Sequence, residues 1–492
     1  MLVVGAGLAG LSTAMFLGLH GVKTVVVERH AGMSMHPKAR GQFPHTMEAL
    51  RLAGVDRKMV DASPPDPSFK IIVARSAAGP VLHEVMVDAQ GPDLSAVSSA
   101  GWANCSQERA EPILAGRARE LGAEIRFSTE LVRLEQDDDG VTAVLRDLAT
   151  GEESTFRTPY LVAADGHRSP IRTALGITQH GRGVLGAGVS AIFEADLGDL
   201  LPRNALVYLQ NPDLPGGSGV LVSTDEPGRY AVATADGDHD WVETARIAAG
   251  NPDLDVRIVH TGDRSDTKHL VADRFSEGRV HLVGDAARVM PPTGAFGGNS
   301  AIMDGFHLAW KLAMVVRGEA GPGLLDSHDA ERRPFSDFIA DQQYREFIHR
   351  MRPDLADDTL APPVDPVSKL FFGYRNLSDA VLLEPGDRRE LLENPEEPTG
   401  RPGSRAPHVP LETGSTIELF GRGFVVLTGS QRWIDEASAL GLTAHLVGED
   451  VTKVYGITPE GAVLVRPDFV IAWRTQGHGD LAQALDRILS RV

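Results

Sequence analysis

Cysteine is almost absent from this chain, since Cys105 is the only one among 492 residues. A single thiol forms neither an intramolecular disulfide nor a CxxC redox pair, which favours a reducing, cytoplasmic setting. No stretch approaches 18 uninterrupted apolar residues, so no association with a membrane is expected. The 17 histidines show no ligand spacing such as HExxH, and no metal site is expected either.

Basic charge is also scarce. The chain has 48 lysines and arginines against 67 acidic residues, a net charge of −19, which argues against binding to nucleic acid or to an anionic membrane. The apolar start "MLVVGAGLAGLSTAMFLGLHG" lacks the basic residues that open a signal peptide, so we interpret it as a strand, a turn and a helix. A chain of this length is too long for one core and predicts several domains.

The first 28 residues match a dinucleotide-binding pattern. A short apolar run at 2–4 leads into GAGLAG (5–10), a helical stretch, and a second apolar run that ends in Glu28. In such a unit the first glycine makes a tight turn, the second lets the backbone approach a pyrophosphate, and the third lets helix and strand pack closely. The pyrophosphate lies at the helix N-terminus and the acid accepts a hydrogen bond from a ribose hydroxyl.

The same glycine spacing recurs at 181–186 as GRGVLG, but its surroundings differ. No buried strand is expected before it, and the residues that follow resemble a strand and not a helix. We therefore predict a loop here. Only one dinucleotide then has a dedicated binding unit.

A second unusual stretch, "HLVGDAARVMPPTGAFGGN", covers residues 281–299. Its apolar start predicts the end of a buried strand, followed at once by Asp285. A loop rich in proline and glycine comes next, and a helix is expected from Asn299 or Ser300 to Arg317, with Gly318 ending it. A helix N-terminus carries roughly half a positive charge, which suits a flat ring that becomes anionic on reduction, such as a flavin. Glycines that merely allow tight packing are the alternative.

The remaining sequence predicts two further units. Between 176 and 270, short β-runs alternate with turns, and "DEPG" (225–228) is expected to close a hairpin in an antiparallel sheet. Six prolines and many charges at 384–410 predict a linker. Beyond it, β-runs flank the helical pattern "IDEASALG", so a small α/β domain is expected at 411–492.

Three motifs in this order carry a family resemblance. GAGLAG with Glu28, "AADGHRS" (163–169) and "GDAARVMPPTGAFGGN" (284–299) resemble those of single-component FAD-dependent aromatic hydroxylases of the para-hydroxybenzoate hydroxylase type. "AGWANCSQERAEPIL" and "LVRPDFVIAWR" are similar to the branch that hydroxylates aromatic polyketides, such as aklavinone hydroxylase.

The resemblance implies an α/β (α+β) fold of three domains. A Rossmann-like FAD-binding domain is formed by residues 1–175 and 271–383, and an antiparallel-sheet substrate domain, 176–270, is inserted into it. The linker 384–410 then leads to a thioredoxin-like domain, 411–492, which has no redox cysteines.

The resemblance also assigns the cofactor contacts. The adenosine and pyrophosphate end of FAD is expected at Gly5, Ala6, Gly7, Leu8, Gly10, Glu28, Arg29 and Leu131, and Gln107 is expected near the ribityl–phosphate region. The flavin end is expected at Asp285, Pro292, Gly294, Gly297, Gly298 and Asn299. Asp165 and Gly166 match a motif associated with both FAD and NAD(P)H, and Lys38 and Arg40 are cations that would meet a phosphate or carbonyl. Lys38 and His45 stand where relatives usually have arginine, and Ala295 replaces a common glycine.

The mechanism that the resemblance implies has three stages. NADPH or NADH binds transiently and reduces the flavin, O₂ then forms a flavin C4a-hydroperoxide, and this delivers one oxygen atom to an electron-rich aromatic ring. A cation or base near the substrate oxygen helps, because a phenolate reacts faster than a phenol. The segment "FFGYRNLSDA" makes Tyr374 and Arg375 candidates for this catalytic role, together with Pro292 beside the ring; pairing of Arg375 with a surface acid is the alternative.

The expected function is that of an NAD(P)H-consuming monooxygenase acting on a phenolic or heteroaromatic ring of a polyketide-type natural product. Its partners are the aromatic substrate, O₂ and NAD(P)H, and it is expected to be a monomer or homodimer. Two alternatives share these motifs: a flavoprotein that sequesters an aromatic antibiotic without catalysis, and a monooxygenase that inactivates one. A flavin halogenase is disfavoured, since none of the five tryptophans forms the WxWxIP signature.

Overall fold

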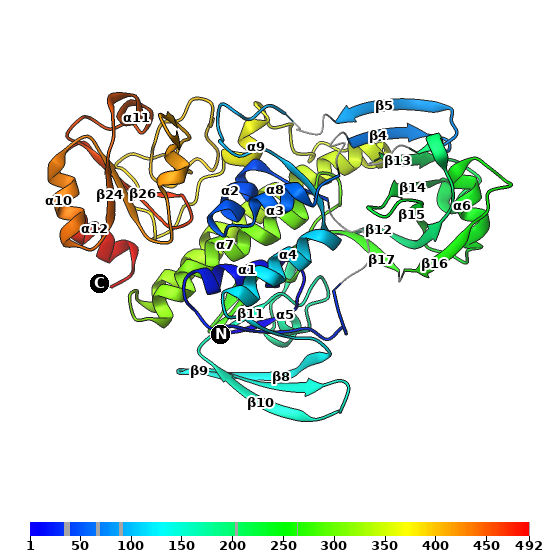
Figure 1. The fold of residues 1–492 in the computed structure, drawn as a ribbon, viewed down its shortest axis with the longest axis horizontal. Coiled ribbons are helices and arrows are strands. Elements are labelled where there is room, and N and C mark those ends of the chain that lie inside the picture. Colours follow the sequence, from blue (N-terminus) through cyan, green and yellow to red (C-terminus); the bar gives the residue numbers. More distant parts are fainter. Residues whose placement is uncertain (34–39, 65–68, 88–91, 202–204, 263, 492) are drawn as a thin grey trace.

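The computed structural model describes residues 1–33, 40–64, 69–87, 92–201, 205–262 and 264–491. Three parts lie in a row (Figure 1): a C-terminal domain, a central part with the long helices α7 and α8, and a β-sheet whose outer side carries α6, Trp241–Ala249. Within the described ranges, no helix is both long enough and apolar enough to span a bilayer.

The central sheet has the order β18-β19-β11-β1-β2-β7, and all its neighbours are parallel except β18 and β19. Its strands are β1 Leu2–Val4, β2 Val25–Val27, β7 Glu124–Arg126, β11 Leu161–Ala163, β18 Ser276–Glu277 and β19 Val280–Leu282. The carboxyl ends of parallel strands meet at one edge of a sheet, where ligands of open α/β folds bind. The residues that leave β1, β2, β11 and β19 there include Gly5, Glu28, Asp165 and Asp285. The predicted strands at 2–4, 22–28 and 281–283 are confirmed.

Helix α1, Leu8–Leu19, is buried at every position and packs on α7, Phe296–Val316. The two helices cross closely, because a Cβ at Gly305 would lie 2.8 Å from the Thr13 backbone nitrogen. Helix α7 begins earlier than the predicted Asn299, since buried Phe296 packs on Phe43 with ring centroids 4.6 Å apart. Its predicted end is confirmed by Gly318, which follows the helix with φ +71°.

The other elements of the central part surround this core. They comprise helices α2 Pro44–Leu52, α3 Asp56–Asp61, α4 Gln107–Glu120, α5 Pro170–Ala174, α8 Asp326–Met351 and α9 Ser368–Phe372, with strands β3 Arg40–Gln42, β6 Ala103–Ser106, β8 Thr129–Asp137, β9 Gly140–Asp147 and β10 Glu153–Thr158. Strands β8 to β10 form a separate antiparallel sheet, seen at the bottom of Figure 1.

The sheet of the predicted substrate domain has nine strands, in the order β20-β17-β12-β15-β14-β13-β4-β5 with β16 paired to β12. The strands are β4 Phe69–Ala74, β5 Val81–Val87, β12 Gln179–Glu194, β13 Ala205–Gln210, β14 Ser218–Ser223, β15 Arg229–Ala235, β16 Arg257–Thr261, β17 Ser265–Ala272 and β20 Arg288–Val289. The predicted strands and the hairpin at 225–228 are confirmed, and β12 begins at Gln179, close to the expected boundary at 176. Three strands from outside 176–270, namely β4, β5 and β20, also belong to this sheet. Strand β4 joins the sheet by parallel pairing with β13, a long-range contact that no local pattern reveals.

The prediction of a loop at 181–186 is wrong, because these residues belong to strand β12. They pair with β17 through two register shifts, one between Gly181 and Gly183 and one between Val184 and Gly186. A Cβ at Gly181 would lie 2.4 Å from the His269 carbonyl oxygen. The glycines therefore allow β-bulges in this strand. A strand in place of a turn and a helix agrees with the expectation that 181–186 does not bind a second dinucleotide.

The segment predicted as a linker is packed against the protein over part of its length. Arg405 donates through Nε to Glu48 at 3.1 Å and also binds that carboxylate through Nη2. Both side chains are almost fully buried, as are Ser404 and Ala406. The prolines of 384–410 interrupt regular structure here without leaving the end of the segment exposed.

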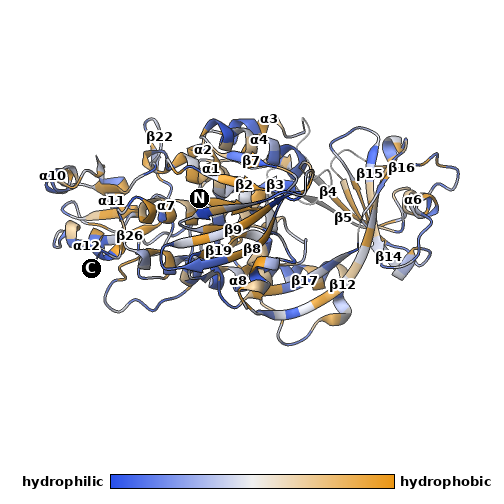
Figure 2. Cartoon of the chain, turned by 90° about the horizontal axis from the view of Figure 1, so that it is seen from below, coloured by the Kyte–Doolittle hydropathy of each residue, from blue (hydrophilic) through white to orange (hydrophobic). Residues whose placement is uncertain are grey.

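The C-terminal domain contains a four-stranded sheet in the order β24-β23-β25-β26. Its strands are β23 Val425–Thr428, β24 Thr443–Leu446, β25 Ala462–Val465 and β26 Ile471–Thr475, with helices α10 Gln431–Ala439, α11 Glu449–Val454 and α12 Leu481–Ile488; a short β21 Pro410–Leu411 and β22 Gly414–Ser415 precede them. Figure 2 shows apolar residues concentrated in the strands of this sheet and of the central one. The predicted α/β unit is found, and the helix expected at 434–441 is α10, which begins three residues earlier.

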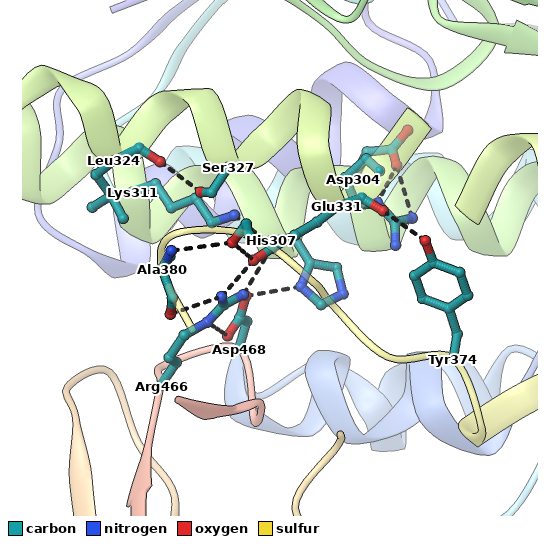
Figure 3. Close-up of polar contacts among 12 residues, drawn as sticks. Asp304, His307, Lys311, Leu324, Ser327, Glu331, Tyr374, Ala380, Arg466 and Asp468 are labelled. Carbon is teal, nitrogen blue, oxygen red and sulfur yellow. Dashed lines mark hydrogen bonds and ion pairs between the residues drawn. The ribbon is translucent and has the colours of Figure 1, made fainter. Parts of the chain in front are cut away.

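A buried ionic cluster joins the C-terminal domain to the central helices (Figure 3). Glu331 of α8 accepts from Lys311 of α7 at 2.7 Å and from Arg466, which follows β25, at 2.6 and 3.0 Å. Arg466 also binds Asp468, whose carboxylate lies 2.9 Å from His307 Nδ1. Removing one partner of such a buried pair costs about 3–5 kcal/mol. The C-terminal domain is therefore fixed to α7 and α8.

Candidate FAD and substrate site

The turn between β1 and α1 is built so closely that only glycine fits. A Cβ at Gly5, where φ is +106°, would lie 2.2 Å from the Ala164 carbonyl oxygen. A Cβ at Gly10 would lie 1.9 Å from the Gly5 carbonyl oxygen. The first and third glycines of the motif thus make the contacts that their spacing predicted.

The N-terminus of α1 is open to a ligand. Gly7 caps the helix without any side-chain hydrogen bond, and a Cβ there would meet nothing closer than Glu111 Oε1 at 3.9 Å. The first amides of a helix have no partner within it and favour an anion. The backbone at Gly7 and Leu8 therefore fits a pyrophosphate, which makes this cradle suitable for the FAD that the motif implies.

Glu28 lies against the same turn. Its carboxylate accepts from the Ala6 N–H at 2.8 Å and from the His30 N–H at 2.9 Å. The neighbouring Arg29 is exposed, and the start of β8 adjoins this point because the Thr129 N–H donates to the Glu28 carbonyl at 2.8 Å. Leu131 follows in β8, so the predicted ribose and adenine contacts occupy one region.

Gln107 reaches the turn through a second acid. It begins α4 and donates through Nε2 to Glu111 Oε1 at 2.7 Å, and Glu111 is the group nearest to Gly7. Glu111 is 1% exposed. The sequence analysis did not identify this buried carboxylate, and its position one turn after Gln107 on the same helix was the available signal.

Asp165 follows β11, and its carboxylate already accepts hydrogen bonds from nearby residues of the chain. It accepts from Ser169 Oγ at 2.6 Å and from the Ile171 N–H at 3.0 Å, which holds the start of α5. Burial raises the pKa of this carboxyl, partly offset by these hydrogen bonds. Gly166, with φ +82°, continues the turn. Their role toward FAD or NAD(P)H stays a prediction.

Asp285 extends from a short turn after β19 and is exposed. The preceding Gly284 packs against α1, since a Cβ there would lie 2.6 Å from the Ala9 Cβ. Buried Asp304 of α7 accepts from the Gly284 N–H at 2.9 Å and from Arg288 at 2.5 Å. Burial alone would raise the pKa of Asp304, but Arg288 and Arg332 outweigh it and lower that pKa to about 2. An anionic anchor thus fixes the turn that presents Asp285.

We call residues 291–299, which comprise the loop 291–295 and the first turn of α7, the glycine loop. It leads into α7 through Ala295, whose φ of +60° lies in the left-handed region that favours glycine, and no side chain caps the helix. Thr293 fixes the loop by donating to the Gln343 carbonyl at 2.8 Å, whereas Pro292 is exposed. The bare N-terminus of α7 fits a ring that carries negative charge. Gly294, Gly297 and Gly298 are partly exposed along it.

Asn299 connects the glycine loop to strand β3. Its side-chain oxygen accepts from the Phe43 N–H and its amide donates to the Gly41 carbonyl, both at 2.9 Å. Arg40, at the start of β3, binds the Asp225 carboxylate of the substrate domain. Lys38 lies outside the described residues.

The catalytic hypothesis for Arg375 is not supported by its geometry. Arg375 is 0% exposed, pairs with Asp387 at 2.7 Å, and donates to the Pro402 carbonyl at 2.7 Å. This is the ion pair that the sequence analysis left open as the alternative, with a partner that is itself nearly buried. Tyr374 donates to the Glu331 carbonyl at 3.3 Å and lines a cavity of about 50 Å³ together with Asn299.

A different arginine lies between the substrate sheet and the glycine loop. Arg350, near the end of α8, donates to the Thr293 carbonyl at 2.6 Å and pairs with Glu346 of the same helix at 3.0 Å. It lies close enough to Tyr208 of β13 to affect the pKa of its hydroxyl. Tyr208 is 8% exposed, and burial raises its pKa, while Arg350 acts in the opposite direction. The sequence analysis missed this pair; its only signal was a tyrosine at a buried position of an otherwise apolar strand.

Over the part of the chain that the structure describes, no three histidine, cysteine, aspartate or glutamate side chains are grouped as metal ligands would be.

Comparison with known proteins identifies the family. The model of an FAD binding domain matches residues 1–343, and that of the aromatic-ring hydroxylase C-terminal domain matches 399–492. The chain belongs to the FAD-dependent aromatic-ring hydroxylases, and it is an FAD-dependent aromatic monooxygenase.

Individual relatives specify the branch. Aklavinone 12-hydroxylase DnrF of Streptomyces peucetius is 44% identical over 88% of this chain and 91% of its own length. A 4-methyl-5-nitrocatechol 5-monooxygenase of Burkholderia is 38% identical over 98% of this chain and 94% of its own. The structure of aklavinone-11 hydroxylase in a ternary complex with FAD and aklavinone is similar with a TM-score of 0.91 and 38% identity, covering 100% of this chain and 98% of that one. The predicted resemblance is confirmed.

The two glycine motifs allow a matched test. Gly10→Ala places a methyl group 1.9 Å from the Gly5 carbonyl oxygen, whereas Gly186→Ala, the third glycine of the second motif, meets nothing within 4 Å. We expect Gly10→Ala to weaken FAD binding at least about tenfold, the loss of one good hydrogen bond to a charged group. Gly186→Ala should bind FAD as the unmodified protein does. Fluorescence titration of the apoproteins measures both; equal losses would contradict the assignment.

Proposed function

We propose that this protein uses NAD(P)H and O₂ to hydroxylate a phenolic ring of an aromatic polyketide. The observation that carries the proposal is the meeting of two uncapped helix N-termini, those of α1 and α7, with acidic residues at the carboxyl ends of the central sheet. An extended dinucleotide whose far end is a flavin matches both. The relatives named as aklavinone hydroxylases support the choice of substrate class.

The residues of the chain would divide the work of holding FAD. The Gly5–Gly10 turn and α1 would bind the pyrophosphate, Glu28 a ribose hydroxyl, and Asp285 the ribityl chain. The glycine loop and the N-terminus of α7 would face the flavin ring. When bound, FAD accepts electrons from NAD(P)H and activates O₂, chemistry that the protein itself cannot supply.

Substrate activation is assigned to Arg350 in place of Arg375. Its guanidinium contacts the glycine loop through Thr293, is held on α8 by Glu346 at 3.0 Å, and lies near Tyr208 of the β13 sheet. A phenolic ring bound between the glycine loop and this sheet would meet a cation that favours its ionised form, and a phenolate is the better nucleophile toward an electrophilic oxygen. Arg350 and Tyr208 would thus orient the ring and raise its electron density.

Isotope labelling tests the reaction class. With NAD(P)H and a panel of aromatic polyketides under ¹⁸O₂, we expect one ¹⁸O atom in the product, measured by mass spectrometry. Label that comes only from H₂¹⁸O would contradict a monooxygenase. Tight binding of the aromatic compound without NAD(P)H oxidation would favour the sequestering function, and loss of antibiotic activity in the product would favour inactivation.

A substitution tests the role of Arg350. Arg350→Ala should leave FAD affinity within about twofold but lower the coupled hydroxylation rate about 10–100-fold, because a charge-assisted contact is worth about 1.5–3 kcal/mol. Peroxide released per NAD(P)H should rise, and Arg350→Lys should restore part of the coupling. Arg333→Ala, on the same helix but paired only loosely with Asp329 at 3.6 Å and Asp337 at 3.7 Å, is the control. An unchanged peroxide ratio in Arg350→Ala would remove Arg350 from the site.

A further inference from the structure

The turn between β14 and β15 extends from the substrate sheet toward the central part of the protein, where its residue Asp225 contacts side chains of that part. Asp225 in this turn has a side chain only 3% exposed. Its carboxylate binds Arg40 of β3 and Ser106, which ends β6, and lies 3.1 Å from Arg109 Nε of α4. A turn residue at the rim of a sheet is normally solvated, so this burial requires a specific set of partners.

Those partners belong to the FAD-binding domain, and backbone carbonyls of that domain hold both arginines. Arg40 also donates to the Asn104 carbonyl at 3.3 Å, and Arg109 donates to the Ala62 carbonyl at 2.9 Å. Two guanidinium groups and one hydroxyl therefore converge on a single buried carboxylate. A buried carboxylate is stable when it is paired and hydrogen-bonded in this way.

Strand β3 carries the connection onward to the glycine loop. Figure 2 shows β3 at the junction between the central part and the substrate sheet. The residue after Arg40 is Gly41, whose carbonyl accepts from Asn299 at 2.9 Å, and Phe43 donates to the same side chain at 2.9 Å. One short strand is thus held by the substrate domain at its start and by the glycine loop at its end.

We infer that Asp225 is a positioning residue that sets the glycine loop relative to the substrate sheet. It acts through Arg40 and β3 on Asn299, without touching the cofactor or the substrate itself. The ring to be hydroxylated and the flavin are held by these two elements, so their separation depends on this contact. The inference rests on the proposed function, but the effect of Asp225 on FAD binding is measurable without turnover.

Asp225→Asn keeps the size of the side chain and removes the charge that holds Arg40 and Arg109. We expect the FAD dissociation constant of the apoprotein to rise about tenfold, and peroxide per NAD(P)H to rise during turnover. Asp225→Glu should restore part of both. The matched control is Asp213→Asn in the same domain, since Asp213 is 68% exposed and lies 3.6 Å from Arg75. If Asp225→Asn binds FAD as tightly as Asp213→Asn, the inference is wrong.

A double-mutant cycle separates positioning from general destabilisation. Arg40→Gln, Asp225→Asn and the double variant are compared by FAD titration and by urea unfolding of the apoproteins. If Asp225 acts through Arg40, the double variant should bind FAD with the same affinity as whichever single variant binds it more weakly. Additive losses would overturn the inference, and so would a loss of stability with unchanged FAD affinity. Absence of hydroxylation in the unmodified protein would contradict the proposed function. The FAD affinities of this cycle would still test the role of Asp225, because they do not depend on turnover.

Discussion

Helix α7 is held from both ends, and the buried charges along its length are the constraint on which the site depends. At its C-terminal half, Lys311 binds Glu331, which Arg466 of the C-terminal domain also holds, and all three side chains are 0% exposed. At its N-terminal half, Asp304 binds Arg288 and Arg332. Buried charges tolerate no loss of a partner, so they specify one position for the helix. The C-terminal domain, which has no cysteine, contributes to this role by packing and charge.

The position of α7 also determines where the glycine loop lies. The same helix that is fixed by charge in its interior ends without a cap at the loop, where a ring with negative charge would lie. Ala295 adopts φ +60° there at a cost of about 1–2 kcal/mol relative to glycine. Strain of this kind persists where the surrounding structure fixes the chain, and here Asn299 and Thr293 do so. Hydrogen bonds of Thr293 and Asn299 therefore hold the glycine loop to α8 and to β3.

Local sequence signals predicted the strands and turns of the central sheet, but they did not predict the contacts that join distant segments. The motif at 5–10 and the strand ends at Glu28 and Asp285 depend on neighbours in the sequence, so their pattern was sufficient. The joining of β4 to β13, and the proximity of Arg350 to Tyr208, link residues far apart in the chain that no periodicity connects. Arg375 was chosen by resemblance over ten residues, and its partner Asp387 is visible only in three dimensions.

Hydrogen–deuterium exchange of the full chain, with and without FAD, tests the central claim directly. FAD should slow exchange of amides in the 5–10 turn and in the glycine loop with the first turn of α7, because both lie uncapped before binding. The 466–468 segment should show slow exchange in both states, since its ion pairs are already formed. Protection at 181–186, or protection at the 5–10 turn with none in the glycine loop, would contradict the proposed course of the cofactor from α1 to α7.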